Sequence, residues 1–230
     1  MRKSIVLLIC IINLQLYIVS AQHSSDYSSG ARPMAVSTLP ETEGKDDLQR
    51  RFFRQEWSNG TVFFAKNRYE ANIPLLFDVY NNRLYFLKDK VIMEFIEPVT
   101  EFRIELNDKN DSLMMQFRNA YPPVHSNTAE TFYEVLIDGG IQLLKCKAKS
   151  IYLHKDQEVP EERRRNDKEQ YYVFLNDGEM VLIKKDKKQI LQALPAYAGK
   201  IDEIINKQKL KLKQEDDLKE LIFLLNRGEL

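Results

Sequence analysis

Between residues 61 and 184 the sequence alternates short apolar runs with turn residues, and this pattern restricts the fold more than any other feature. The runs are rich in Val, Ile, Phe and Tyr, which favour strands. The turn signals between them include Asn81-Asn82, Asp138-Gly139-Gly140 and Asn176-Asp177-Gly178. Because glycine tolerates a positive φ, the last two signals predict tight hairpins. The segment therefore predicts an antiparallel meander.

The expected strands lie at residues 61–65, 75–79, 83–87, 91–96, 102–106, 113–118, 132–137, 141–147, 171–175 and 179–184. Residues 102–106 alternate apolar and charged side chains, as in a sheet with one wet face. Other strands, such as 91–96, are apolar on both faces, and an open single sheet would leave one of those faces exposed. We therefore expect an α+β fold, mainly antiparallel β, in which the meander forms a two-layer sheet or a partly open barrel.

The C-terminal tail changes to a helical period. Asp186 can accept amide hydrogen bonds at the start of a short helix that ends near Pro195. Apolar residues then recur at helical spacing over 197–205 and 218–225. Residues 209–213 alternate lysine with leucine and predict an extended link. We expect two to three helices over residues 186–228, docked on the sheet because helices of this length are unstable alone.

The first 21 residues have the pattern of a secretory signal peptide. Arg2 and Lys3 precede an apolar run, and small residues follow at Ser20 and Ala21. The run is shorter than the roughly 20 residues that a membrane span needs, which favours cleavage over a retained anchor. Cys10 lies inside the run without a small residue before it, so we expect no lipid anchor. The predicted location is the periplasm or the extracellular space.

Residues 22–47 are rich in Ser, Pro, Thr and charge, and predict a disordered leader. A single β-rich domain is expected over residues 48–230. Removal of Arg2 and Lys3 from the 34 basic residues would leave 32, against 34 acidic residues. This balance gives no reason to expect nucleic acid as a partner. The mature chain would also lack a transmembrane segment, because no second long apolar run is present.

Several residue groups could carry chemistry, and each also has a plain structural explanation. Cys146 with His125 or His154 could form a nucleophile and base, but Cys146 shares a predicted strand face with Leu144, where a cysteine behaves as a small hydrophobe. Residues 107–111 resemble part of a calcium loop without its glycine and distant glutamate. No metal site is therefore expected. No phosphate loop, nucleophile elbow or dinucleotide fingerprint occurs, so we expect no cofactor.

Glu94, Glu97 and Glu101 could gather around Pro98 as hydrolytic carboxylates, although solvated charges at strand ends are the better explanation. No catalytic residue is therefore assigned.

A stripe of lysines is the candidate ligand-binding feature. Lys145, Lys147 and Lys149 share one face of the strand at 141–147 and its continuation. They could bind an anionic glycan or a lipid head group, or they could protect a sheet edge against aggregation. Asp111-Ser112-Leu113 resembles the acceptor sequence for O-glycans on exported proteins of Bacteroidota, so Ser112 is a candidate modification site.

Larger segments resemble a group of uncharacterised exported envelope proteins from Bacteroidota. The segments that carry this resemblance are residues 57–62, 74–80, 97–102, 131–136, 141–145 and 171–184, with the last two helices. Together they span residues 57–226. The group has no assigned reaction, so the resemblance implies an envelope protein and transfers no functional residues.

The leading hypothesis from the sequence is a non-enzymatic envelope binding or interaction module, whose partner would be an envelope protein or an anionic glycan. One alternative is a hydrolase that acts on an envelope polymer through carboxylates assembled by the fold. The other is a carrier for a small apolar ligand. The sequence leaves the oligomeric state open.

Overall fold

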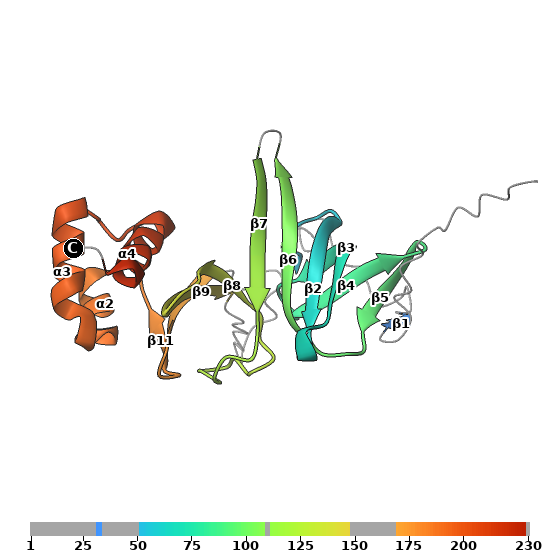
Figure 1. Cartoon of the computed structure of the whole chain (residues 1–230), viewed down its shortest axis with the longest axis horizontal. Helices are drawn as coiled ribbons and strands as arrows, with labels where there is room; N and C mark the ends of the chain where they lie inside the picture. Colours follow the sequence, from blue (N-terminus) through green and yellow to red (C-terminus); the bar gives the residue numbers. More distant parts are fainter. Residues whose placement is uncertain (1–30, 34–50, 109–110, 148–168, 229–230) are drawn as a thin grey trace, which may run out of the picture.

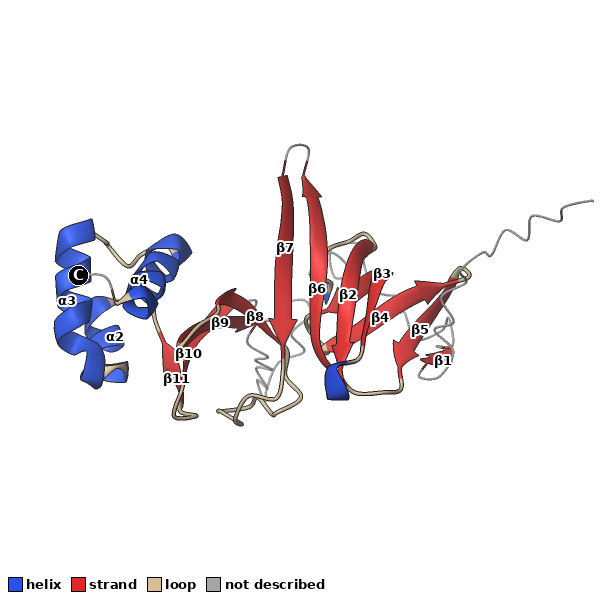
Figure 2. Ribbon diagram, viewed as in Figure 1, coloured by secondary structure: helices blue, strands red, loops and turns tan. Residues whose placement is uncertain are grey.

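The computed structural model describes residues 31–33, 51–108, 111–147 and 169–228. In this part of the chain an antiparallel sheet of eleven strands carries helices at one end (Figures 1 and 2). The strand order is β1-β5-β4-β3-β2-β6-β7-β8-β9-β10-β11, so the sheet is open, with β1 and β11 at its edges. The expected α+β fold, mainly antiparallel β with docked C-terminal helices, is confirmed.

The strands are β1 (Ala31–Pro33), β2 (Ser58–Phe64), β3 (Tyr69–Asp78), β4 (Arg83–Lys88), β5 (Val91–Phe95), β6 (Val99–Asp108), β7 (Asp111–Arg118), β8 (Tyr133–Ile137), β9 (Ile141–Lys147), β10 (Glu169–Leu175) and β11 (Met180–Ile183). The helices are α2 (Lys187–Ala193), α3 (Ala198–Gln208) and α4 (Glu215–Arg227), and two 3-10 turns are η2 (Ala65–Asn67) and η4 (Pro195–Tyr197). None of the helices in the described residues is long and apolar enough to cross a membrane.

Within the predicted leader, residues 22–47, the structure describes only Ala31–Pro33. These three residues form β1, which pairs with β5 from Ala31 opposite Phe95 to Pro33 opposite Met93. The outer edge of β5 offers free amides and carbonyls, and an extended segment satisfies them whatever its composition. The signal peptide and the remainder of the predicted leader lie outside the described residues.

Strands β2 to β7 curl around an aromatic core. The rings of Phe64 on β2 and Phe95 on β5 lie 5.8 Å apart, although β3 and β4 separate those strands in the sheet. Phe77, Phe102 and Phe117 fill the concave face, and the rings of Phe102 and Phe117 stack at 4.8 Å. Large aromatic side chains such as these dominate core energetics. The curl therefore buries one face of the sheet without a second sheet.

The two faces of strands β8 to β11 are covered by different parts of the chain. On one face the helices bury apolar residues of the sheet such as Leu143, Val173 and Ile183 against Ile201 and Leu221. On the other face the loop between β7 and β8 covers the cluster of Tyr121, Tyr133, Leu144 and Tyr172. Both faces of these strands are therefore buried, as their apolar sequences require.

The local signals for the helices are confirmed, but the extended link is wrong. Asp186 accepts a hydrogen bond from the amide of Gln189 at 3.0 Å and so caps α2. Between α3 and α4, Lys209 and Leu212 have φ angles of 56° and 54°, so the chain turns twice instead of extending. Leu212 is buried in the helical core, and this burial outweighs the alternating pattern of residues 209–213.

Helix α4 is fixed to the sheet by one asparagine. The amide of Ile141 at the start of β9 donates to Asn226 Oδ1 at 2.8 Å, and Asn226 Nδ2 donates to the carbonyl oxygen of Ile141, also at 2.8 Å. The Cβ of any other residue at Gly139 would lie 2.7 Å from Asn226 Nδ2, so the adjacent turn needs its glycine. This clip sets how the last helix lies on β9.

We predict that Asn226→Ala lowers the free energy of unfolding by about 2 kcal/mol, because both polar groups of the Ile141 backbone lose this partner. Asn206→Ala is the matched control, since Asn206 is exposed in the last turn of α3. Urea titration followed by circular dichroism measures both. Equal stability of the two variants would contradict the importance of the clip.

Candidate functional site

The sheet divides between β7 and β8, and a cavity lies at the division. Strands β6 and β7 pair over eight residue pairs, whereas β7 and β8 pair only at Phe117 with Glu134 and Arg118 with Tyr133. Beyond these two pairs β7 remains paired with β6 and β8 with β9, but β7 and β8 no longer pair with each other. The space between the two halves is a cavity of about 100 Å³.

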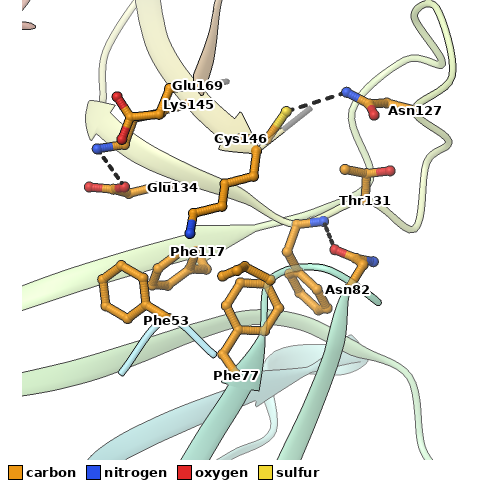
Figure 3. A pocket seen from close by; sticks show the side chains of 13 residues that line it. Phe53, Phe77, Asn82, Phe117, Asn127, Thr131, Glu134, Lys145, Cys146 and Glu169 are labelled. Carbon is orange, nitrogen blue, oxygen red and sulfur yellow. Dashed lines mark hydrogen bonds and ion pairs between the residues drawn. The ribbon is translucent and has the colours of Figure 1, made fainter. Parts of the chain in front are cut away.

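The floor of the cavity is aromatic. Phe53, Phe77, Phe117 and Phe132 line it together with Val79. The first three of these rings are labelled in Figure 3. The ring of Phe117 lies 5.0 Å from that of Phe53 and 5.1 Å from that of Phe77, in edge-to-face and tilted arrangements. Such packing holds the rings in place, so the apolar floor is preformed.

A buried ion pair positions Phe53. Arg51 Nε donates to Asp78 Oδ2 at 2.5 Å, and the side chain of Asp78 is fully buried. The same carboxylate accepts hydrogen bonds from the amides of Tyr80 and Asn81. The amide of Phe53 in turn donates to the carbonyl oxygen of Phe77 at 2.8 Å. The segment before β2 is thereby fixed along the end of β3, with Phe53 in the cavity.

Asn82 holds the opposite wall. Its Oδ1 accepts from the amide of Phe132 at 2.8 Å, and its Nδ2 donates to the carbonyl oxygen of Glu130 at 2.8 Å. Asn82 has a φ of 56°, a left-handed conformation that asparagine tolerates better than most residues. These two bonds fix the end of the loop between β7 and β8, which contributes Thr131 and Phe132 to the lining.

The rim on the β8–β10 side carries a charged cluster. Lys145 Nζ lies 2.9 Å from Glu134 Oε2 and 2.9 Å from Glu215 Oε2. The Tyr171 hydroxyl lies 2.9 Å from Glu169 Oε2 and 3.0 Å from Glu215 Oε2. We call these five residues the lysine–carboxylate cluster. It connects β8, β9 and β10 to the first turn of α4.

Burial and the charges within the cluster shift the pKa values of Glu134, Lys145 and Tyr171. Burial raises the pKa of Glu134, and the neighbouring ammonium of Lys145 only partly offsets this. Burial also opposes the charge of Lys145, but its hydrogen bonds and attraction to Glu215 and Glu134 outweigh burial and raise its pKa. Burial and the two carboxylates raise the pKa of Tyr171, which therefore stays protonated. The cluster keeps its cation across the whole physiological range.

The lysine stripe predicted from the sequence is divided by the fold. Lys145 and Lys147 both line the cavity, but Lys145 pairs with two carboxylates, whereas Lys147 makes no ion pair within the described part of the chain. Lys149 lies outside the described residues. Ser112 lies on β7 opposite Asn107, far from the two residue pairs that join β7 to β8. The structure thus brings two of these candidates to the cavity, and only Lys145 of the two has an ion-pair partner among the described residues.

Cys146 lies in a hydrogen-bonded setting and not beside a histidine base among the described residues. The Cys146 sulfur accepts from Asn127 Nδ2 at 3.5 Å (Figure 3), and Asn127 also donates to the Tyr172 hydroxyl at 3.3 Å. His125 is exposed on the loop between β7 and β8, and His154 lies outside the described residues. Nearby, the Tyr133 hydroxyl is buried without a well-placed hydrogen-bond partner, and burial raises its pKa to about 12.

The three glutamates near Pro98 are paired with different arginines. Glu94 contacts Arg83, Glu97 contacts Arg68, and Glu101 contacts both Arg103 and Arg118. Among the described residues, no group of three or more acidic, histidine or cysteine side chains could hold a metal ion.

Sequence reasoning missed most of the cavity. The sequence pattern places Phe77, Phe117 and Phe132 in strands and Asn82 in a turn, and it gives none of them a shared site. Their shared site depends on pairings between distant segments, which leave no spacing signal. Comparison with protein-family models, with curated proteins and with solved structures finds no match for this chain.

We predict that Lys145→Gln lowers the free energy of unfolding by about 2 to 3 kcal/mol at neutral pH, because two partly buried carboxylates lose their cation. Lys147→Gln is the matched control on the same strand face, with little expected effect.

The pH dependence of this loss tests its cause. The raised pKa of Lys145 means that its contribution is present below the ordinary lysine pKa and is lost as the pH rises through the folded-state value. At acid pH Glu134 protonates early, because its pKa is raised, and it then no longer needs the cation. The gap between wild type and Lys145→Gln in urea titrations should therefore shrink at about pH 4. A gap that does not change with pH would contradict the charge-pair explanation.

Proposed function

We propose that the protein is an exported, non-enzymatic binding module of the cell envelope that holds a compact apolar ligand in the cavity between β7 and β8. The observation that carries this proposal is the combination of four packed phenylalanine rings with a polar rim in one preformed cavity. Binding sites for small molecules are concave and mostly apolar, with a few fixed polar groups for orientation.

The size of the cavity indicates the ligand class. An apolar cavity of about 150 Å³ is enough to bind benzene. The volume of about 100 Å³ is smaller than this, so the cavity suits the apolar end of a molecule, such as one ring or a short branched chain, whose remainder lies at the rim. Asn127, Thr131 and Lys147 on the rim could hydrogen-bond a polar end that faces the solvent. A phenyl or isopropyl group that carries a hydroxyl fits this description.

The ion pairs and hydrogen bonds of the nearby carboxylates favour binding over hydrolysis. Glu134 and Glu215 share the ammonium of Lys145, and Glu169 accepts from the Tyr171 hydroxyl. Hydrolysis of a glycan needs two carboxyl groups that flank one bond and are free to exchange protons or attack. In the described part of the cavity wall these carboxyl groups already stabilise the fold, so the same cluster supports a structural role.

Filling the cavity tests the proposal. We predict that benzyl alcohol binds to the mature chain in a saturable manner, and that Val79→Phe weakens this binding by about tenfold or more because the new ring occupies the cavity. Val91→Phe is the matched control, since Val91 is 41% exposed on β5. Ligand-detected NMR measures binding, and thermal unfolding verifies that both variants fold. Glycerol is the polar control ligand.

Two results would contradict the proposed function. One is wild-type protein that binds benzyl alcohol no better than glycerol. The other is a folded Val79→Phe variant that binds like wild type. If neither result occurs, mass spectrometry of small molecules released by denaturing protein from the native host identifies the natural ligand, and Val79→Phe should release less of it than Val91→Phe.

Export is a separate part of the proposal and has its own test. The expected mature protein begins at Gln22 and is recovered from the envelope or the medium, in keeping with the exported Bacteroidota proteins that the sequence resembles. Fractionation of the native host followed by N-terminal sequencing measures this. Full-length protein that retains Met1 in the cytosol would overturn it.

A further inference from the structure

We propose that the link between α3 and α4 is a second binding surface, which takes an acidic polysaccharide chain. The link appears in Figure 2 as the tan segment between those helices. Its charged side chains, together with the last lysine of α3, are called the basic link: Lys207, Lys209, Lys211 and Lys213. The inference goes beyond the apolar ligand proposed above, because no residue of the basic link lines the cavity.

All four lysines of the basic link are exposed, and within the described residues none of them makes an ion pair. Residues 204–214, which include all four lysines, contain no acidic residue. Four like charges so close together produce a positive local potential, although the whole chain has no net formal charge. Keeping uncompensated charges together costs energy, so the arrangement favours an anionic partner.

The three acidic residues that follow the link are already committed elsewhere. Glu215 pairs with Lys145 on β9, and Asp216 pairs with Lys219 one turn further along α4. Asp217 Oδ2 accepts a hydrogen bond from the amide of Lys213 at 3.1 Å. Glu215 and Asp216 thus pair with cations outside the basic link, and Asp217 is bonded to backbone amides rather than to a lysine side chain.

The backbone of the link is fixed at three points. The amide of Leu210 donates to the carbonyl oxygen of Ile205 at 3.1 Å, which closes the end of α3. The side chain of Leu212 is only 1% exposed in the helical core. Asp217 holds the other end through the Lys213 amide. The lysines therefore project from a preorganised backbone, and a ligand would not have to order it first.

The composition of the link favours a polysaccharide over other polyanions. Its two apolar side chains, Leu210 and Leu212, pack against the helical core, so neither is available to insert into a lipid surface. It carries no aromatic ring on which a nucleic-acid base could stack. Exposed amines without an apolar or aromatic neighbour fit the regularly spaced carboxylate, sulfate or phosphate groups of an acidic glycan.

The test compares two variants with the same change in net charge. The link variant replaces Lys207, Lys209, Lys211 and Lys213 with Gln. The control variant replaces four exposed basic residues elsewhere with Gln, namely Arg54, Lys66, Lys90 and Lys188. Biolayer interferometry measures binding of the full mature chain to immobilised dextran sulfate, with uncharged dextran as the reference. Thermal unfolding verifies that both variants fold.

We expect wild-type protein to bind dextran sulfate at about 0.15 M salt and to lose this binding at about 1 M salt, where charges are screened. The link variant should bind about tenfold more weakly or worse, and the control variant within about twofold of wild type. Wild-type protein that binds dextran sulfate no better than dextran would overturn the proposal. So would equal losses in both variants, or binding to phosphatidylglycerol vesicles without binding to dextran sulfate. None of these results bears on benzyl alcohol binding in the cavity.

Discussion

The short contact between β7 and β8 is the constraint on which the rest of the structure depends. Two residue pairs join the halves of the sheet, and Arg118 reinforces them by bonding Glu101 on β6 and Asp138 in the turn after β8. A longer ladder would bring β8 alongside the whole of β7 and close the cavity. A shorter ladder would leave the two halves without a shared sheet. The site exists because the ladder is long enough to connect the halves and too short to fill the space between them.

The polar groups on both sides of this division have partners within the protein. Asn82 and Asn226 each bond both an amide and a carbonyl oxygen of a distant segment, so each satisfies two backbone groups with one side chain. Lys145 compensates two carboxylates that burial would otherwise penalise. Each device removes the cost of an unpaired polar group, and the phenylalanines can then form an apolar surface beside them.

Local sequence patterns predict the strands, turns and helix cap, but not the contacts between segments that lie far apart in the chain. Residues 141–147 form a strand as the sequence predicts, and Gly178 has the positive φ that its hairpin needs. Asp186 caps α2 for the reason that its position indicates. The curl of β2 to β7 depends on contacts such as Phe64 with Phe95, and the loop wall depends on Asn82 bonding residues 48 and 50 positions away. Such contacts have no periodicity, so no local pattern reports them.

The lysines show why charge function is the hardest property to read from a sequence. Residues 145–149 and 207–213 both alternate lysine with other residues, and by sequence alone the two runs are equivalent. In the fold Lys145 lies between Glu134 and Glu215, so its charge is consumed within the protein. The same Glu215 directly follows the second run, but its carboxylate pairs with Lys145 and not with a lysine of that run. One interior ion pair therefore removes a lysine from the first run and preserves the charge of the second.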